Sequence, residues 1–416
     1  MTSLFPKQLL LVPALALIAL SASAQESPDQ KRASLPPTTP WNLEELRKVP
    51  HVDWKESGTS RTLFYAGEPF EGKPTRVYAC YATPGTLSGD SSKDKNLPGI
   101  VLVHGGGGKA FPRWAELWAS RGYAAIAMDL SGSGKPHQPQ TDAGPRQKDE
   151  VIFRTDAPAT DQWSYHAVAS VIRAHSLLRS FPEVDSERTA ITGISWGGYL
   201  TCIVAGLDDR FKAAVPVYGC GFLSENSHWL SYFEKMPEES RDNWVRLWDP
   251  SQYVGSATMP MLFVNGGKDF AYPPDSHART YALVKTLKNL CFLPDLNHGH
   301  LFDNPPAIEH FIRHHLEGGA PLARIAEPEV KENQVSAQVD SHTKLIKAEL
   351  HYTTNHIPGP AKSRVWTTLP AQITDHTIHA TLPAEQPSIW FLNVTDDRKA
   401  TTSSRLIIAA EAAKSP

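Results

Sequence analysis

The stretch TAITGISWGG, Thr189 to Gly198, decides the fold of this protein. A β-branched, apolar run leads into Ser195, which has a glycine two positions before it and another two positions after it. A serine on a sharp turn between a strand and a helix needs this spacing, because side chains at the two flanking positions would collide. Residues 199–205 continue with a helical pattern. The stretch therefore predicts a strand, a tight turn that carries Ser195, and a helix.

Short apolar runs alternate with helical patterns on both sides of this turn. Uninterrupted apolar runs are typical of strands buried on both faces of a parallel sheet. The expected strands are 76–81, 100–103, 124–128, 189–192, 213–217, 261–264 and 290–294, and the expected helices are 114–120, 162–178 and 307–316. A long polar loop, 131–161, interrupts the alternation. The pattern predicts an α/β fold with a doubly wound, mostly parallel sheet.

The pattern changes near Gly319. Apolar and polar residues then tend to alternate with period two, and polar or proline-bearing turns separate the runs. The expected strands here are 335–339, 346–352, 365–366, 389–394 and 406–408. This segment, 325–412, predicts a small all-β domain, an immunoglobulin-like sandwich. Because Ser195 and its turn precede this domain, we expect the activity of the chain not to require it.

The N-terminus has the features of an export signal. Lys7 supplies a positive charge, residues 9–20 form an apolar core, and Ala22-Ser23-Ala24 is a small-residue cleavage site. We expect residues 1–24 to be a signal peptide and the protein to be periplasmic or secreted. The apolar run is short for a bilayer span, so we expect no stable membrane association, with an uncleaved anchor as the alternative. Residues 25–97 are then an N-terminal extension with the first strands, and residues 98–320 the catalytic domain.

The composition narrows the classes of partner. Hydrophobic residues make up 41% and charged residues 20% of the 416 residues, as in ordinary globular proteins. The formal net charge is -3 and no long basic run is present, so we expect no nucleic-acid partner. In an exported protein one disulfide is compatible with the four cysteines, but the sequence does not select a pair. These are Cys80, Cys202, Cys220 and Cys291.

A histidine and four glycines, His104 to Gly108, follow the expected strand 100–103. Glycines let backbone N–H groups point at negative charge that develops on a carbonyl oxygen. Gly105 and Gly106 are the expected donors of such an oxyanion hole, with the backbone N–H of Trp196 as a further donor. His104 is interpreted as a structural residue of the loop. A phosphate-binding loop is the alternative, but Lys109-Ala110 lacks the Lys-Ser/Thr pair that it needs.

A serine nucleophile on this fold needs an acid and a histidine that follow it in the chain. Asp269 comes just after the strand 261–264, and His298 just after the strand 290–294. Asp275 and His300 are close rivals. A metal site at the two histidines is disfavoured, because no third ligand lies at a usual spacing. We predict a triad of Ser195, His298 and Asp269 that needs no metal and no other cofactor.

An insertion at about 221–258 is rich in aromatic residues and is expected to form a lid over the serine. Its aromatic side chains either bind substrate or fill the core of the lid. The candidate substrate-binding residues are Trp229, Trp244 and Trp248. In the C-terminal segment, Trp366 and Trp390 pose the same choice between a core position and a platform for sugar rings.

From about Pro98 to Leu316 the chain resembles the α/β-hydrolase superfamily. More narrowly, it resembles secreted bacterial acetyl xylan esterases and dienelactone-hydrolase-like proteins, which are akin to prolyl oligopeptidase catalytic domains. The best-known acetyl xylan esterases of this fold have Gln after the serine and Glu after the histidine, where this chain has Trp196 and Gly299. The residues that carry the resemblance are His104 to Gly108, Phe181 to Asp185, Gly193 to Gly198, Asp269 and His298.

The resemblance implies a serine esterase that hydrolyses carboxylic esters outside the cytoplasm. The expected partner is a small-molecule or polysaccharide ester, with an acylated carbohydrate favoured. A peptidase and a lactonase or dienelactone hydrolase are alternatives, because a triad does not determine the leaving group. A non-catalytic carbohydrate-binding protein is the alternative from another class. A complete triad with an oxyanion loop argues against it.

Overall fold

The structure is a computed structural model that describes residues 34–55, 58–134, 140–355 and 364–409. The expected signal peptide, 1–24, lies outside these residues. Within the described part of the chain, no helix is both long and apolar enough to cross a membrane. All of the described residues belong to one compact unit.

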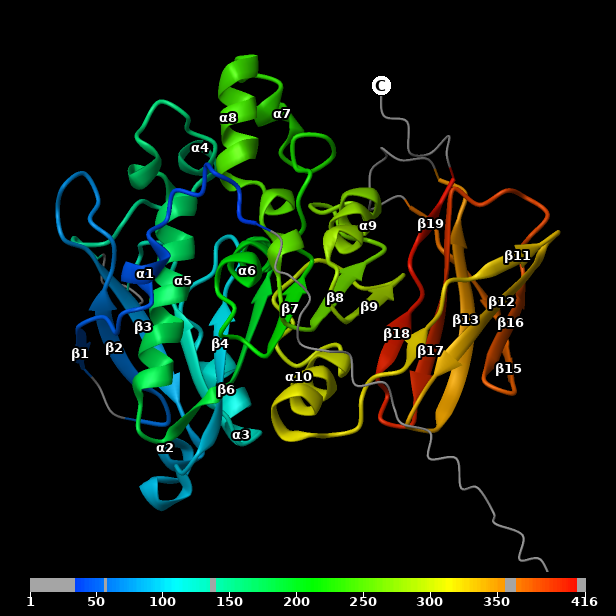
Figure 1. Ribbon diagram of the computed structural model, residues 1–416, viewed down its shortest axis with the longest axis horizontal. Coiled ribbons are helices and arrows are strands. Elements are labelled where there is room, and N and C mark those ends of the chain that lie inside the picture. The colour runs from blue at the N-terminus through cyan, green and yellow to red at the C-terminus, as the bar shows by residue number, and fades with distance from the viewer. Residues whose placement is uncertain (1–33, 56–57, 135–139, 356–363, 410–416) are drawn as a thin grey trace, which may run out of the picture. The chain divides into compact units, whose positions relative to one another are not determined.

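The main sheet has parallel strands at its centre and antiparallel strands at its N-terminal edge (Figure 1). The order along the sheet is β1 (Val52–Trp54), β2 (Arg61–Ala66), β3 (Arg76–Ala82), β5 (Ala124–Met128), β4 (Leu97–Val103), β6 (Val184–Ile194), β7 (Ala213–Val217), β8 (Met261–Gly266) and β9 (Lys288–Leu293). Strands β4 to β9 pair in parallel, and β3 pairs antiparallel with β5 and β2. This arrangement confirms the predicted α/β class.

Helices cover the parallel strands. Helix α5 (Trp163–Ser180) packs against β4, β5 and β6, and α6 (Trp196–Leu207) packs beside it. Arg121, which follows α3 (Pro112–Ser120), forms an ion pair with Glu309 of α10 (Ala307–Glu317). Almost every residue of α5 and α6 is buried, because both helices lie between the sheet and other segments of the chain. The remaining helices are α1 (Leu43–Leu46), α2 (Pro84–Ser88), α4 (Asp149–Ile152), α7 (Leu230–Phe233), α8 (Glu238–Trp248) and α9 (Pro274–Leu283).

The C-terminal strands extend the main sheet and add a second one. Beyond β9 the main sheet continues with β18 (Thr401–Ser403), β17 (Ile389–Asp396), β13 (Leu345–Thr353) and β14 (Thr367–Pro370), and β19 (Ile407–Ile408) pairs with β17. The second sheet contains β10 (Arg324–Ile325), β12 (Gln334–Asp340), β16 (Thr377–Thr381), β15 (Gln372–Thr374) and β11 (Glu329–Lys331). A second apolar core, with Val335, Leu350 and Leu392 among its members, contains residues of both sheets. The predicted all-β segment is therefore present.

One local expectation from the sequence needs correction, because residues 365–366 precede β14 instead of forming a strand. The four cysteines all lie among the described residues, and each side chain is buried. They behave as small apolar side chains in the core, and no disulfide joins any two of them.

Candidate active site

Ser195 lies on a strained turn between β6 and α6. Its backbone φ of 61° and ψ of -119° lie outside the regions that non-glycine residues normally adopt. The flanking glycines make the turn sterically feasible. A Cβ added to Gly193 would lie 2.2 Å from the carbonyl oxygen of Gly197, and one added to Gly197 would lie 2.0 Å from that of Val103. The turn presents the serine hydroxyl at the carboxyl end of the parallel sheet, as the glycine spacing predicts.

The three predicted triad residues form one hydrogen-bonded chain. His298 Nε2 lies 2.8 Å from Ser195 Oγ, and His298 Nδ1 lies 2.9 Å from Asp269 Oδ2. The other carboxylate oxygen of Asp269 accepts the backbone N–H groups of Ala271 at 2.7 Å and Tyr272 at 2.9 Å. Asp269 is buried, so its carboxylate is held in one orientation toward the imidazole.

The rival acid and the rival base have other partners. Asp275 accepts two hydrogen bonds from the Asn226 side chain, at 3.0 and 2.9 Å. His300 Nε2 accepts the backbone N–H of Gly105 at 3.2 Å. Burial, together with the nearby His104 and His298, lowers the pKa of His300 to about 4, so His300 is a neutral acceptor near neutral pH.

The contact with His300 corrects one expectation for the oxyanion hole. Because the Gly105 N–H already donates to His300, Gly105 is not an available donor. Gly105 is needed for another reason, since an added Cβ would lie 2.8 Å from Ser195 Cβ. Gly106 and Trp196 both line the pocket beside Ser195.

The buried His104 side chain stabilises the glycine loop by hydrogen bonds to backbone groups. The backbone N–H of Leu130 donates to His104 Nε2 at 2.8 Å, so the ring proton is on Nδ1 and is donated to the Gly105 carbonyl at 2.7 Å. Burial lowers the pKa of this imidazole, which favours the neutral form. The two bonds give His104 the structural role that the sequence suggests.

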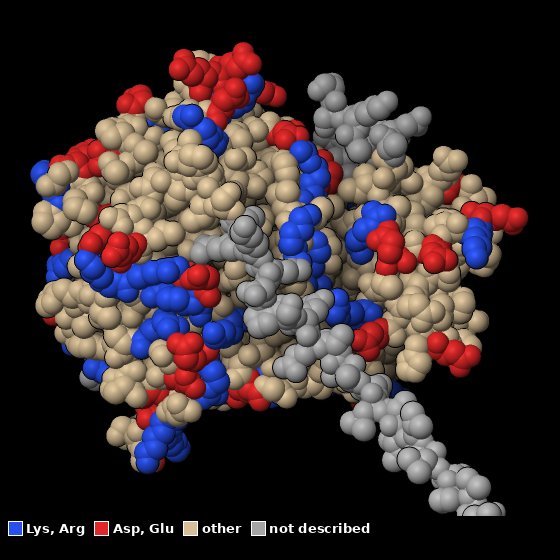
Figure 2. All heavy atoms as spheres, in the orientation of Figure 1, with Lys and Arg blue, Asp and Glu red and all other residues tan. Residues whose placement is uncertain are grey.

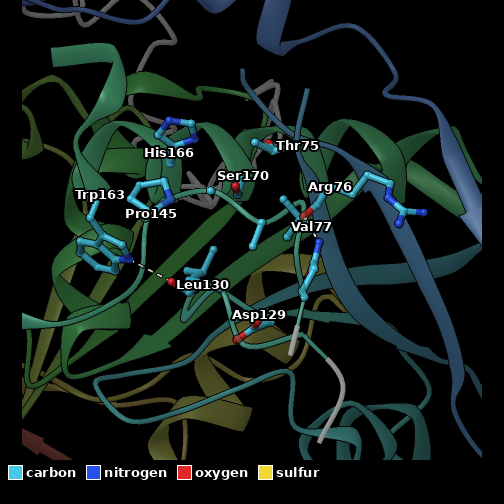
Figure 3. A pocket seen from close by; sticks show the side chains of 14 residues that line it. Thr75, Arg76, Val77, Asp129, Leu130, Pro145, Trp163, His166 and Ser170 are labelled. Carbon is cyan, nitrogen blue, oxygen red and sulfur yellow. Dashed lines mark hydrogen bonds between the residues drawn. The ribbon is translucent and has the colours of Figure 1, made fainter. Parts of the chain in front are cut away.

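Leu130 also lines a small cavity (Figure 3). Trp163 Nε1 donates to the Leu130 carbonyl at 2.9 Å, the dashed line in Figure 3. The Asp129 carboxylate accepts the backbone N–H of Gly134 at 2.7 Å and that of Ser131 at 3.0 Å. The cavity volume of about 30 Å³ suits a single water molecule and not a substrate.

The pocket beside Ser195 has a volume of about 290 Å³. Aromatic rings form much of its wall, and the described segments that line it come from the glycine loop, α4, the β6–α6 turn and the loops after β7, β8 and β9. The lining residues are Gly106, Asp149, Ile194, Ser195, Trp196, His228, Trp229, Phe270, Ala271, His298, Gly299 and His300.

The structure separates the three tryptophans that were candidates for substrate binding. Trp229 lines the pocket and packs against Trp196, with ring centroids 4.4 Å apart. Trp244 and Trp248 do not line it. Both are fully buried, and their indole N–H groups donate to the Ile152 carbonyl and to the Gln162 side chain. These two residues therefore fill the core of the insertion, which corrects the expectation that they contact substrate.

Asp149 is a pocket residue that sequence reasoning missed. It lies in the first turn of α4, at the end of the long polar loop, and faces the pocket together with His228. Burial raises the pKa of its carboxyl, while a hydrogen bond from Trp229 and the nearby His228 oppose the rise. Helices α4, α7 and α8 lie together on one side of the molecule in Figure 1. Phe153 joins them, stacking on both Trp244 and Tyr232.

A family comparison identifies the chain. The family model for acetyl xylan esterase (AXE1) matches residues 42–279, which is more than half of the sequence. The chain belongs to the acetyl xylan esterase family. It has the α/β-hydrolase fold. The match includes Ser195 and Asp269 but ends before His298. A second model, for PhoPQ-activated pathogenicity-related protein, matches residues 231–357.

Two curated relatives share less than a quarter of their residues with the matched part of the chain. Acetyl esterase Axe7A of Xylanibacter ruminicola is 24% identical over 283 residues, covering 62% of this chain and 61% of that protein. The uncharacterized peptidase YuxL of Bacillus subtilis is 22% identical over 295 residues, covering 63% of this chain and 40% of that protein. The chain thus spans less than half the length of this peptidase relative.

Solved structures show the same fold. The acetyl xylan esterase from Paenibacillus sp. R4 superposes with a TM-score of 0.54 at 23% identity, covering 66% of this chain and 92% of that chain. Acetyl xylan esterase 1 from Thermoanaerobacterium sp. JW/SL YS485 gives 0.52 at 20% identity, covering 68% and 96%. The likeness covers about two thirds of this chain.

Proposed function

We propose that this protein removes short acyl groups, such as acetyl, from neutral carbohydrates outside the cytoplasm, with Ser195, His298 and Asp269 as its catalytic triad. The observation that carries the proposal is the hydrogen-bonded chain from Asp269 through His298 to Ser195 Oγ, with the serine facing a pocket of about 290 Å³. The proposed location of the protein outside the cytoplasm rests on the signal-like residues 1–24.

In the proposed mechanism, His298 Nε2 takes the hydroxyl proton as Ser195 Oγ attacks the ester carbonyl carbon. The tetrahedral intermediate then expels the alcohol, which receives that proton from His298. Water enters, His298 takes its proton, and the acyl-enzyme is hydrolysed to the free acid and Ser195. Asp269 accepts from His298 Nδ1 throughout, which orients the ring and stabilises its positive form.

The carbonyl oxygen becomes an oxyanion in each tetrahedral intermediate and needs donors in place beforehand. We propose the backbone N–H groups of Gly106 and Trp196 for this task. Both residues line the pocket beside Ser195, and Trp196 is the first residue of α6, where an N–H has no partner within the helix. The positive end of the helix dipole adds to the stabilisation.

The size and charge of the pocket support a short, neutral substrate. A volume of about 290 Å³ lies at the lower limit of small-molecule sites and leaves little room for a long acyl chain. Asp149 places a carboxyl group on the wall, where it can accept a sugar hydroxyl and repels an anionic substrate. Acidic side chains also gather over α8, on the outer surface of the insertion (Figure 2).

A peptidase is the second candidate function. The peptidase relatives and the carboxyl group of Asp149 favour it, since a carboxylate beside a serine nucleophile can bind a peptide amino terminus. An esterase and a peptidase differ in whether they need this charge. The ester reaction proceeds on substrates without an amine, whereas binding of an amino terminus requires the carboxylate.

A substrate panel tests the proposal. Initial rates on nitrophenyl acetate, butyrate and octanoate, on acetylated xylan, and on an amino-terminal dipeptide amide are compared for the wild type and Ser195→Ala. We expect the highest kcat/KM on acetate, acetate release from xylan, and loss of all these activities in Ser195→Ala. A higher kcat/KM for the dipeptide amide would assign the chain as a peptidase. Activity retained by Ser195→Ala would refute the triad.

A further inference from the structure

The C-terminal β segment lies directly against the strand that leads to His298. Residue Ser403 of β18 pairs with Leu290 of β9, so the main sheet passes from the catalytic part into the C-terminal part. Ser403 Oγ accepts the backbone N–H of Phe292 at 2.8 Å, and the Asn393 side chain donates to the Phe292 carbonyl at 3.1 Å. The outer edge of β9 is therefore bonded to protein at these positions.

The same segment also contacts the loop that carries Asp269, residues 267–273, which joins β8 to α9. Trp366 Nε1 donates to the Gly267 carbonyl at 3.1 Å, and Arg364 Nη1 donates to the same oxygen at 3.4 Å. The contact is close, because a Cβ added to Gly267 would lie 2.3 Å from Trp366 Nε1. Glycine at this position makes room for the indole.

Packing holds both donors in place. The Trp366 ring contacts Phe292 of β9 and Phe391 of β17, with centroids 5.6 and 5.5 Å apart. Arg364 is only 4% exposed, although a guanidinium group is costly to bury unless it has partners. Trp366 is therefore wedged between the two parts of the chain and is not an open platform for sugar rings. Trp390 is buried in the second core, so neither tryptophan forms such a platform.

A hydrogen bond to the Gly267 carbonyl can affect the position of Asp269, which lies two residues further along the chain. The Asp269 N–H bonds the Gly266 carbonyl at 3.1 Å, and the Gly267 N–H bonds the Leu293 carbonyl at 2.9 Å. Lys268 lies between Gly267 and Asp269, and its ion pair with Asp295 is largely exposed and contributes little. The Gly267 carbonyl, by contrast, accepts from the partly buried Trp366 and the buried Arg364.

We propose that the C-terminal β segment completes the active site, with Trp366 and Arg364 as positioning residues that hold the Asp269 loop in register with His298. The inference rests on the proposed triad. It replaces the expectation that hydrolysis does not require this segment. Catalytic geometry tolerates errors of only about 0.5 Å, and a misplacement of about 1 Å can cost roughly 100-fold in rate.

Trp366→Phe in the full-length protein tests the proposal, because it removes the N–H and keeps an aromatic ring. Trp390→Phe is the matched control, since it makes the same chemical change in the second core. For Trp366→Phe we expect kcat on nitrophenyl acetate to fall about 10-fold with KM nearly unchanged. We also expect the acid limb of the kcat/KM profile to move to lower pH, because a displaced carboxylate stabilises the imidazolium less. Arg364→Lys should move both readouts in the same direction by less.

A spectroscopic readout separates this inference from the proposed function. The low-field proton resonance of His298 Nδ1–H, assigned by its loss in Asp269→Asn, reports the hydrogen bond without requiring turnover. It should be shifted or broadened in Trp366→Phe and unchanged in Trp390→Phe. If kcat, the pH profile and the resonance of Trp366→Phe all match the control, positioning is refuted, even if thermal stability falls. If Ser195→Ala stays active while the resonance responds, the proposed mechanism fails and the positioning role stands.

Discussion

The two histidines that lie two residues apart should differ greatly in their effect on hydrolysis. His298→Ala removes both bonds of the triad, at 2.8 and 2.9 Å. Loss of a triad member typically lowers kcat by about 10⁴- to 10⁶-fold, which corresponds to roughly 5–8 kcal/mol of transition-state stabilisation. His300→Ala removes one neutral acceptor, 3.2 Å from the Gly105 N–H. A bond of this kind contributes about 1 kcal/mol, so we expect a loss of only about 5-fold.

The assay is the initial rate on nitrophenyl acetate with both variants and with Ser195→Ala purified in the same way, which measures any contaminating esterase. Thermal melting shows whether each variant is folded, and labelling by a fluorophosphonate probe counts reactive serines. His298→Ala should fall to the Ser195→Ala background, and His300→Ala should label at a rate close to that of the wild type. A His298→Ala variant with more than about 1% of wild-type kcat, or a reversed ranking of the two variants, would refute the assignment of the base.

Three further predictions follow from single residues. Asp149→Asn should raise kcat/KM for a succinyl ester relative to an acetyl ester by about 5-fold, because it removes about 1 kcal/mol of repulsion; an unchanged ratio would mean that Asp149 does not face the acyl group. Burial lowers the pKa of His277 to about 3, below its ordinary value of 6.5, so its contribution to stability is lost as pH falls from about 6.5 toward 3. His277→Leu should therefore flatten the decline in melting temperature over that range, whereas the exposed His379→Gln should leave it unchanged. Trp244→Ala should lower the free energy of unfolding in urea by about 3–5 kcal/mol, since the ring is fully buried; a normal stability with abolished substrate binding would contradict its core position.

Local sequence was sufficient for the central strands and for the turn that carries Ser195. The expected strands 124–128 and 213–217 have the same bounds in the structure, because uninterrupted apolar runs suit strands that are covered on both faces. The turn at Ser195 could be predicted for a similar reason. The clash that excludes a side chain at Gly193 involves Gly197, four residues further along, so that steric requirement is visible in a short stretch.

Side-chain direction and partners from distant segments were decided only by the tertiary structure. Gly105 carries the same signal as Gly106, yet its N–H is taken by His300, which lies 195 residues further along the chain. Trp229 and Trp244 share one aromatic insertion, but one ring lines the pocket and the other meets Ile152 in the core. Composition and periodicity cannot separate these outcomes. Each depends on which atom of a distant residue arrives within about 3 Å, and packing of the whole chain determines that.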